Sequence, residues 1–153
     1  MLSIADPQRE FNMNDTPKFR KLTPVLYCEA IEACLPFWVD TLGFTVGASI
    51  PAGDRLGFVM LAQNSVEVML QSYASLAEDM PKLVDGARGQ SSYLFLEVEN
   101  LDVLSARLGS TEVVMPRRQT FYGSTEIGVR SPGGHFITLA EMNLCKQSTP
   151  PQP

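Results

Sequence analysis

The sequence holds few of the residues that a disulfide framework or a metal centre requires. Its 153 residues include three cysteines, Cys28, Cys34 and Cys145, and one histidine, His135. The cysteine count is odd and no pair has CxxC spacing, so neither a disulfide framework nor a structural zinc site is supported. A reducing cytoplasm is the simplest location to expect for such a chain.

Long apolar runs and an excess of positive charge are also missing. No run reaches the roughly 18 apolar residues of a membrane span, and residues 1–21 contain no apolar core resembling a signal peptide. We therefore expect neither a membrane partner nor export. Lys and Arg number 12 against 17 Asp and Glu, a net charge of −5, which argues against a nucleic-acid partner because phosphates require a basic face. The acidic balance favours a cationic small molecule only weakly, since solubility explains it better.

The chain does contain enough apolar residues for a core. Hydrophobic residues make up 44% and charged residues 19%, which at this length fits one compact domain or two half-domains that share a core. We place this domain at residues 21–142. Residues 1–20 and 143–153 are polar and without periodicity, and we expect them to be flexible arms.

The central part of the sequence repeats one order of elements. Apolar periodicity and turn residues predict the order βαβββ over about residues 22–72 and again over about residues 92–142. The first pass comprises residues 22–28, 29–42, 44–50, 55–63 and 66–72, and the second comprises 92–98, 101–108, 112–115, 120–130 with an interruption at Gly123, and 136–141. A helix over 73–84, interrupted near Pro81, connects the two passes. An internal duplication, giving an α+β fold of two tandem modules, is the economical explanation.

The most informative stretch is residues 121–141. Two apolar segments flank the turn Ser131-Pro132-Gly133-Gly134-His135, in which proline restricts one backbone angle and glycine permits positive ones. This pattern predicts a β-hairpin. The position of His135 in the turn favours a structural role over that of a general base.

Several short motifs resemble those of the vicinal oxygen chelate superfamily, the group of glyoxalases, bleomycin-resistance proteins and extradiol dioxygenases. They occur in the family's order over about residues 22–142: Thr23-Pro24-Val25-Leu26 before the first helix, residues 37–44 (FWVDTLGF) at its end, and Tyr122-Gly123 followed by the turn at 131–135. The first two are most similar to bleomycin-resistance proteins. The resemblance implies that each module forms a curled mixed sheet around a cavity, but it assigns no chemistry, since this scaffold hosts many.

In metal-dependent members of that superfamily, the ligands come from the first and last strand of each module and are usually His or Gln and then Glu. The resemblance places these positions at Thr23 and Met69 in the first module, with Glu67 in place of Met69 if the register differs by two residues, and at Tyr93 and Thr138 in the second. Hydroxyl and thioether groups are poor ligands for a hard divalent ion. Three protein ligands cannot be assembled from Glu67 alone, so we expect no metal, no other cofactor and no catalytic residue.

Strand alternation selects the side chains expected to face the cavity. Most are aromatic or polarizable, which suits a partly planar ligand. Trp38 is included, although core packing is the favoured interpretation for it, and Arg117-Arg118 is expected in a solvated turn rather than in an anion clamp. The candidate ligand-binding residues are Thr23, Val25, Tyr27, Trp38, Phe58, Met60, Glu67, Met69, Tyr93, Phe95, Glu97, Phe121, Tyr122 and Thr138.

The leading hypothesis is a metal-independent small-molecule binding protein of the bleomycin-resistance type, which sequesters an aromatic ligand or antibiotic, with a cation favoured by the charge balance. On the resemblance alone, we expect two chains to form a homodimer. The alternative is a metal-dependent lyase, isomerase or dioxygenase of the same superfamily that uses displaced ligands such as Glu67, Glu97 and His135. A third hypothesis is a subunit or interaction module whose cavity is filled with side chains.

Overall fold

The computed structural model describes residue 13 and residues 16–143. Most of the two expected terminal arms, and Cys145, lie outside the described residues. Residues 16–24 form no helix or strand. The expected domain, residues 21–142, contains all the helices and strands of the described part of the chain, and no helix there has the length and apolarity to cross a bilayer.

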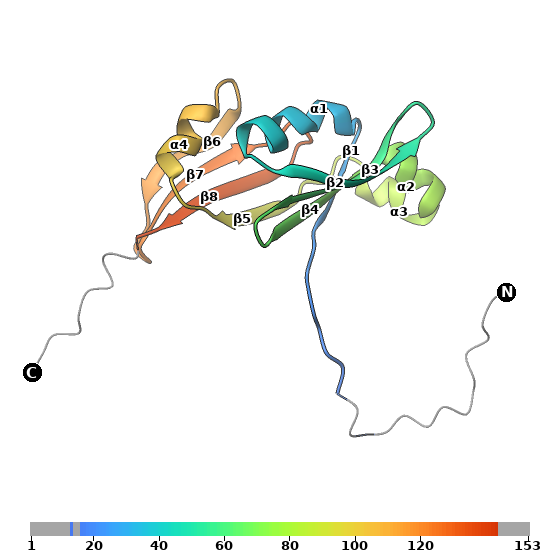
Figure 1. Ribbon diagram of the computed structural model, residues 1–153, viewed down its shortest axis with the longest axis horizontal. Coiled ribbons are helices and arrows are strands. Elements are labelled where there is room, and N and C mark those ends of the chain that lie inside the picture. The colour runs from blue at the N-terminus through green and yellow to red at the C-terminus, as the bar shows by residue number, and fades with distance from the viewer. Residues whose placement is uncertain (1–12, 14–15, 144–153) are drawn as a thin grey trace, which may run out of the picture.

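The first module is a four-stranded mixed sheet with a helical segment on one face (Figure 1). Its elements are β1 (Val25–Cys28), α1 (Ile31–Leu35), the π-helical turn η1 (Pro36–Thr41), β2 (Thr45–Ala52), β3 (Arg55–Gln63) and β4 (Val66–Ser72). The strand order is β1-β4-β3-β2, with β1 parallel to β4 and the other pairs antiparallel. Two short helices, α2 (Tyr73–Asp79) and α3 (Pro81–Ala87), lead to the second module.

The second module repeats this plan. Its elements are β5 (Tyr93–Glu97), α4 (Leu101–Arg107), β6 (Glu112–Gln119), β7 (Ser124–Arg130) and β8 (Phe136–Met142). The strand order is β5-β8-β7-β6, and β5 is parallel to β8. The α+β class and the two βαβββ modules predicted from the sequence are confirmed, and neither sheet closes on itself.

The predicted helix at residues 29–42 is two different helical segments. Pro36 has no backbone N–H, so it cannot donate the α-helical hydrogen bond to the carbonyl four residues earlier. The chain continues as η1, in which the amide of Leu42 donates to the carbonyl of Phe37 at 3.0 Å, five residues back. The helix prediction was correct in place but wrong in type after Pro36.

Strand β6 is longer than predicted. It runs through Pro116 to Gln119, and residues 120–123 form the turn to β7. Proline is tolerated here because β6 is the edge strand and its pairing with β7 is irregular around Met115. Arg117 and Arg118 therefore lie in this strand, and the expectation of a solvated turn was wrong. Each forms an ion pair, Arg117 with Asp102 at 2.7 Å and Arg118 with Glu126 at 3.1 Å.

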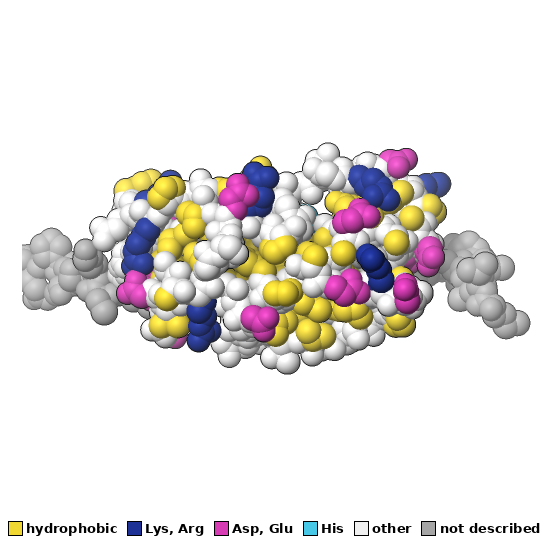
Figure 2. Space-filling view, turned by 90° about the horizontal axis from the view of Figure 1, so that it is seen from above, with side chains coloured by type: hydrophobic (Ala, Val, Ile, Leu, Met, Phe, Trp, Pro, Cys, Tyr) yellow, Lys and Arg dark blue, Asp and Glu magenta, His cyan; other side chains and the backbone are white. Residues whose placement is uncertain are grey.

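The helices cover one face of both sheets, and the two modules share one core. In Figure 1, α1 and α4 lie on the same side of the two sheets. One continuous cluster of buried side chains includes Trp38 and Leu61 from the first module and Leu101 and Leu139 from the second. Seen from the helical side, positive and negative side chains lie close together on the surface (Figure 2).

His135 links the two modules at the end of the β7–β8 hairpin. It is buried, and its Nδ1 atom accepts a hydrogen bond from the amide of Ser92 at 2.9 Å. The ring proton is therefore on Nε2, which donates to the carbonyl of Tyr27 at 2.7 Å. The structural role predicted for this turn residue is confirmed, and the turn itself closes with the amide of Ser131 bonded to the carbonyl of His135 at 2.8 Å.

Candidate functional site

The face of each sheet opposite the helices carries most of the predicted ligand-binding residues, and we call it the open face. On β3, Val59 and Leu61 point into the core, whereas Phe58 and Met60 are half-buried on the other side. Alternation places Val25 and Tyr27 of β1, and Glu67 and Met69 of β4, on this same side. The first open face is therefore lined by aromatic and thioether side chains, with a single carboxylate.

The open face of the second module carries a row of stacked groups. The rings of Tyr93 on β5 and Phe136 on β8 are stacked, with centroids 5.0 Å apart and planes inclined by 12°. The guanidinium of Arg130 on β7 lies 4.7 Å from the centroid of Phe136, on the far side of the row, and also contacts Glu112 at 3.3 Å. Tyr93 remains 78% exposed and Phe95, two residues along the strand, 54% exposed. The ring of Tyr93 at the end of the stack and the neighbouring ring of Phe95 are therefore both exposed to solvent.

The residue pairs of this face explain the row. Tyr93 pairs with Phe136, and Phe136 pairs with Arg130, so the three side chains are direct cross-strand neighbours. The next row contains Phe95, Thr138 and Gly128. Gly128 is buried, and the side chain of Met115 from β6 packs against it.

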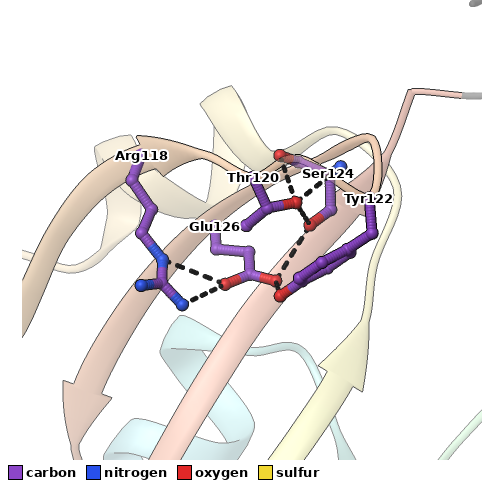
Figure 3. A network of polar contacts seen from close by, with 5 residues as sticks. All are labelled: Arg118, Thr120, Tyr122, Ser124 and Glu126. Atoms are coloured by element: carbon purple, nitrogen blue, oxygen red, sulfur yellow. Dashed lines mark hydrogen bonds and ion pairs between the residues drawn. The ribbon is translucent and has the colours of Figure 1, made fainter.

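A buried carboxylate lies one row further along. Glu126 on β7 is fully buried, and its Oε2 accepts hydrogen bonds from Nε and Nη2 of Arg118 at 3.3 and 3.1 Å. Its Oε1 accepts from the hydroxyl of Ser124 at 2.9 Å and from the phenol of Tyr122 (Figure 3). Since the single proton of Ser124 is used in this way, the hydroxyl of Thr120 donates to Ser124 across 2.7 Å.

This network controls the charge state of Glu126. Burial alone would raise the pKa of its carboxyl group, but the hydrogen bonds from Tyr122, Ser124 and Arg118, together with the positive charge of Arg118, outweigh burial and hold that pKa below its usual value. Glu126 is therefore a carboxylate at neutral pH. Its oxygens are occupied by protein donors, so its role in the structure is to hold other side chains in place.

One of these side chains belongs to the turn at residues 120–123. Tyr122 is half-exposed and Phe121 fully exposed, and their rings meet edge to face with centroids 5.2 Å apart. The carbonyl of Gly123 accepts the amide of Asn143 at 2.8 Å, which ties this turn to the residue after β8. The hydrogen bond from Tyr122 to Glu126 thus fixes an aromatic pair at the end of the open face.

Three predicted site residues differ from the rest. Thr23 lies before β1 and in no strand. Trp38 is 1% exposed and packs edge to face against Phe37 and Phe44 in the core, so it is not part of the open face. Core packing, the alternative weighed for this residue, describes its position. Glu67 is on the open face but forms an ion pair with Lys21, which neutralises its charge.

The register of the sheets identifies equivalent positions in the two modules. Thr23 and Tyr93 occupy equivalent positions in the two modules, so Val25 corresponds to Phe95, two residues further along. Val25 pairs with Met69, and Phe95 pairs with Thr138. Met69, not Glu67, is therefore the counterpart of Thr138.

The side chains at the positions where the resemblance places metal ligands do not fit a divalent metal ion. Thr23, Met69, Tyr93 and Thr138 supply neither a carboxylate nor an imidazole. Across residues 13 and 16–143, no group of three His, Cys, Asp or Glu side chains is arranged to hold a metal. We therefore derive no chemistry through a metal at this site.

The two described cysteines belong to the core. Cys28 and Cys34 are free and buried. A hydrogen bond shared with Cys34, together with burial, raises the pKa of the Cys28 thiol, whereas the same bond lowers the pKa of Cys34. Neither side chain points to the open face, and both pack in the hydrophobic core.

Sequence reasoning missed Glu126 and its partner Arg118. One signal could have found the pair. Glu126 is the only charged residue between Ser124 and Val129, and a carboxylate in an otherwise uncharged strand needs a cation close by. The preceding strand offers Arg118, but the prediction ended that strand at residue 115, so the two were not brought together.

Two partly open cavities lie elsewhere, at the junction of the modules. A cavity of about 730 Å³ lies between the β3–β4 turn and the start of α4, and a second of about 580 Å³ lies between η1 and the end of α4. Of the predicted ligand-binding residues, only Glu97 lines either of these two cavities. The other predicted residues outside the core form an open surface and not an enclosed pocket.

The fold and the sequence together identify the family. A sequence model of the Glyoxalase/Bleomycin resistance protein/Dioxygenase superfamily matches residues 22–139, and the chain belongs to this superfamily. No functionally curated protein shows significant sequence similarity to it.

Several solved structures share the fold. A bleomycin-binding protein from bleomycin-producing Streptomyces verticillus, in complex with copper(II)-bleomycin, is 22% identical with a TM-score of 0.53 over 81% of this chain and 97% of the relative. An antibiotic-binding protein from Streptomyces sp. CB03234 is 19% identical with a TM-score of 0.57 over 82% and 99%. A lactoylglutathione lyase from Agrobacterium tumefaciens is 18% identical with a TM-score of 0.64 over 86% and 99%. At these identities, the similarity shows the fold alone.

Proposed function

We propose that this protein is a metal-independent binding protein that sequesters a planar aromatic small molecule on its open face. The observation that carries the proposal is the stack of Tyr93 on Phe136, with Tyr93 and Phe95 largely exposed beside it. Large aromatic side chains exposed together mark a surface that binds something. Two structural relatives are described as binding bleomycin or an antibiotic, which supports a ligand of this kind.

Stacking supplies most of the affinity in this proposal. A well-placed aromatic pair contributes about 0.5–1.5 kcal/mol beyond the buried area, whereas an exposed ion pair contributes up to about 1 kcal/mol. Tyr93 offers a ring face to the ligand, and the row behind it is already fixed by Phe136 and Arg130. The ligand therefore meets a preorganised surface, which lowers the entropy cost of binding.

The charge of the open faces determines which ligands are preferred. Of the four carboxylates on the two open faces, Glu67 pairs with Lys21, Glu112 with Arg130 and Glu126 with Arg118, while Glu97 is exposed at the end of β5. Together with the net charge of −5, Glu97 favours a cationic ligand over an anionic one. A cytoplasmic location and a homodimer remain predictions that accompany this proposal.

The test is a ligand titration in which binding is measured by calorimetry. The full chain is titrated with bleomycin and with a panel of planar aromatic compounds in matched cationic and neutral forms. We expect at least one cationic member to bind. The Tyr93→Ala and Phe95→Ala variants should each weaken that binding about 2- to 10-fold. Leu83→Ala, which removes a half-exposed side chain on α3, is the matched control and should bind as the original chain does.

Two outcomes would count against the proposal. If no panel member binds, the interaction-module hypothesis gains support. If the purified protein takes up nickel, zinc, manganese or iron stoichiometrically in elemental analysis, the metal-dependent enzyme replaces the binding protein.

A further inference from the structure

The cavity of about 730 Å³ at the module junction has a wall on each module. One wall comes from the first module, at the start of β2 and the β3–β4 turn. The other comes from the end of β5, the start of α4 and the end of β8. The volume falls within the range of small-molecule sites, about 300–1,000 Å³.

The apolar part of the cavity lining comes from the core and from α4. Leu42, Phe44 and Leu139 are buried core residues whose surfaces form the bottom, and Leu104 and Val103 of α4 form one side. A hydrocarbon segment placed there would leave water without opening the core. Each buried methylene group would contribute roughly 0.8 kcal/mol.

The rim carries three carboxylates against one guanidinium. Glu97, Glu99 and Glu141 line the cavity together with Arg107. Glu97, at the end of β5, belongs to the open face and only borders this cavity, whereas Glu99 lies in the bend that follows β5. One carboxylate oxygen of Glu141 already binds the backbone, because Oε1 accepts hydrogen bonds from the amides of Asn100 and Leu101 at 2.7 and 3.4 Å.

We propose that this junction cavity is a second binding site, distinct from the open face, that takes a small amphiphilic ammonium ion. The apolar body of the ligand lies on the floor formed by Leu42, Phe44 and Leu139, and the ammonium group lies at the rim beside Glu99. The surplus of carboxylates attracts a cation and repels a carboxylate of the same shape. Residues of both modules line the cavity, so a bound ligand also bridges the modules.

The test compares three probes that differ only in the head group: n-octylammonium, n-octanoate and n-octanol. The full chain is labelled at its methionine methyl groups, and binding is followed by NMR. Met142 lines the junction cavity, whereas Met60 and Met69 lie on the open face of the first module. We expect n-octylammonium to shift the Met142 signal saturably and to leave Met60 and Met69 unchanged, with n-octanol binding more weakly and n-octanoate weakest.

Two substitutions that change the charge of the rim in opposite directions make the test more specific. Glu99→Gln removes a rim carboxylate and should weaken n-octylammonium binding about 2- to 5-fold, while Arg107→Gln removes the rim cation and should strengthen it by a similar factor. Both side chains are exposed, so the fold is retained. Glu29→Gln, an exposed carboxylate on the other module that pairs with Arg88, is the matched control and should change nothing.

A third variant tests the location. Val103→Trp places a bulky ring from a half-exposed position into the cavity and should abolish the Met142 shift. The proposal is overturned if n-octanoate binds as tightly as n-octylammonium, if the Glu99 and Arg107 variants change affinity in the same direction, or if Val103→Trp binds normally. None of these results depends on the ligand of the open face.

Discussion

At the scale of single residues, Glu126 has the largest influence on the shape of the open face. Its carboxylate holds Tyr122 from the β6–β7 turn and Arg118 from the edge strand. All of its hydrogen bonds come from neighbours within eight residues in sequence. A local network of this kind orders the turn without requiring ligand. It also explains why a charged side chain can be fully buried in this sheet.

Glu126→Gln should destabilise the protein at pH 7 by about 1–3 kcal/mol, because an uncharged amide loses charge-assisted hydrogen bonds with Arg118 and Tyr122. Since the folded pKa of Glu126 lies below the unfolded value, its contribution to stability is present above roughly pH 5 and is lost as the pH falls below about 4. The difference in unfolding free energy between the original chain and the variant, measured with urea, should therefore shrink from pH 7 to pH 3.5. A difference that stays constant or grows would show that the ionised form is not the stabilising one.

At the scale of elements, the close approach of β6 and β7 depends on a glycine. A Cβ atom at Gly128 would lie 2.8 Å from the Cβ of Met115, its cross-strand partner, and a methyl group so close to another Cβ forces the strands apart. Glycine here serves packing and not backbone freedom. On its other side, Gly128 pairs with Thr138 of β8.

Gly128→Ala should lower the free energy of unfolding by about 1–3 kcal/mol because of this overpacking. Gly86→Ala is the matched control, since a Cβ at Gly86 in α3 meets nothing within 4 Å. That change should stabilise the protein by about 0.5–1 kcal/mol through helix propensity. Urea denaturation of both variants measures the two shifts, and a Gly128→Ala variant as stable as the original would contradict the close strand approach.

At the scale of the whole molecule, the open faces remain uncovered in the single chain. Large apolar side chains are exposed on the sheets of both modules, including Ile50 at 59% and Phe95 at 54%. Exposed apolar surface of this extent favours association. The predicted homodimer would use this surface, and a partner there would also enclose the proposed ligand.

Light scattering after size-exclusion chromatography should give about twice the chain mass of 16.8 kDa. Phe95→Asp should shift the equilibrium toward the monomer, because a charge at the centre of a buried interface loses its hydration. Leu83→Asp changes a half-exposed residue on α3 and should leave the mass unchanged. A monomeric mass for the original chain at all concentrations would exclude the dimer.

The sequence by itself determined the elements and their order. Strands β3 and β4 occur at their predicted residues, and the β7–β8 hairpin follows from the turn at residues 131–135. These features depend on local patterns, since alternation and turn residues act over a few neighbours. The same patterns indicated that Val25 and Phe58 face away from the core. Even the misassigned end of β6 has a local cause, because proline reads as a strand break wherever the edge position of the strand is unknown.

Only the tertiary structure decided which side chains meet. The stack of Tyr93, Phe136 and Arg130 brings together three strands, and its register depends on hydrogen bonds between segments about 40 residues apart. Likewise, Trp38 has the same local pattern whether it faces a ligand or the core, and only the packing of η1 on the sheets places it inside. The cavity at the module junction exists because two modules dock, which no local pattern specifies. Long-range pairing and docking are set by the summed burial of many residues, so the geometry of a site composed from distant segments emerges only in the folded chain.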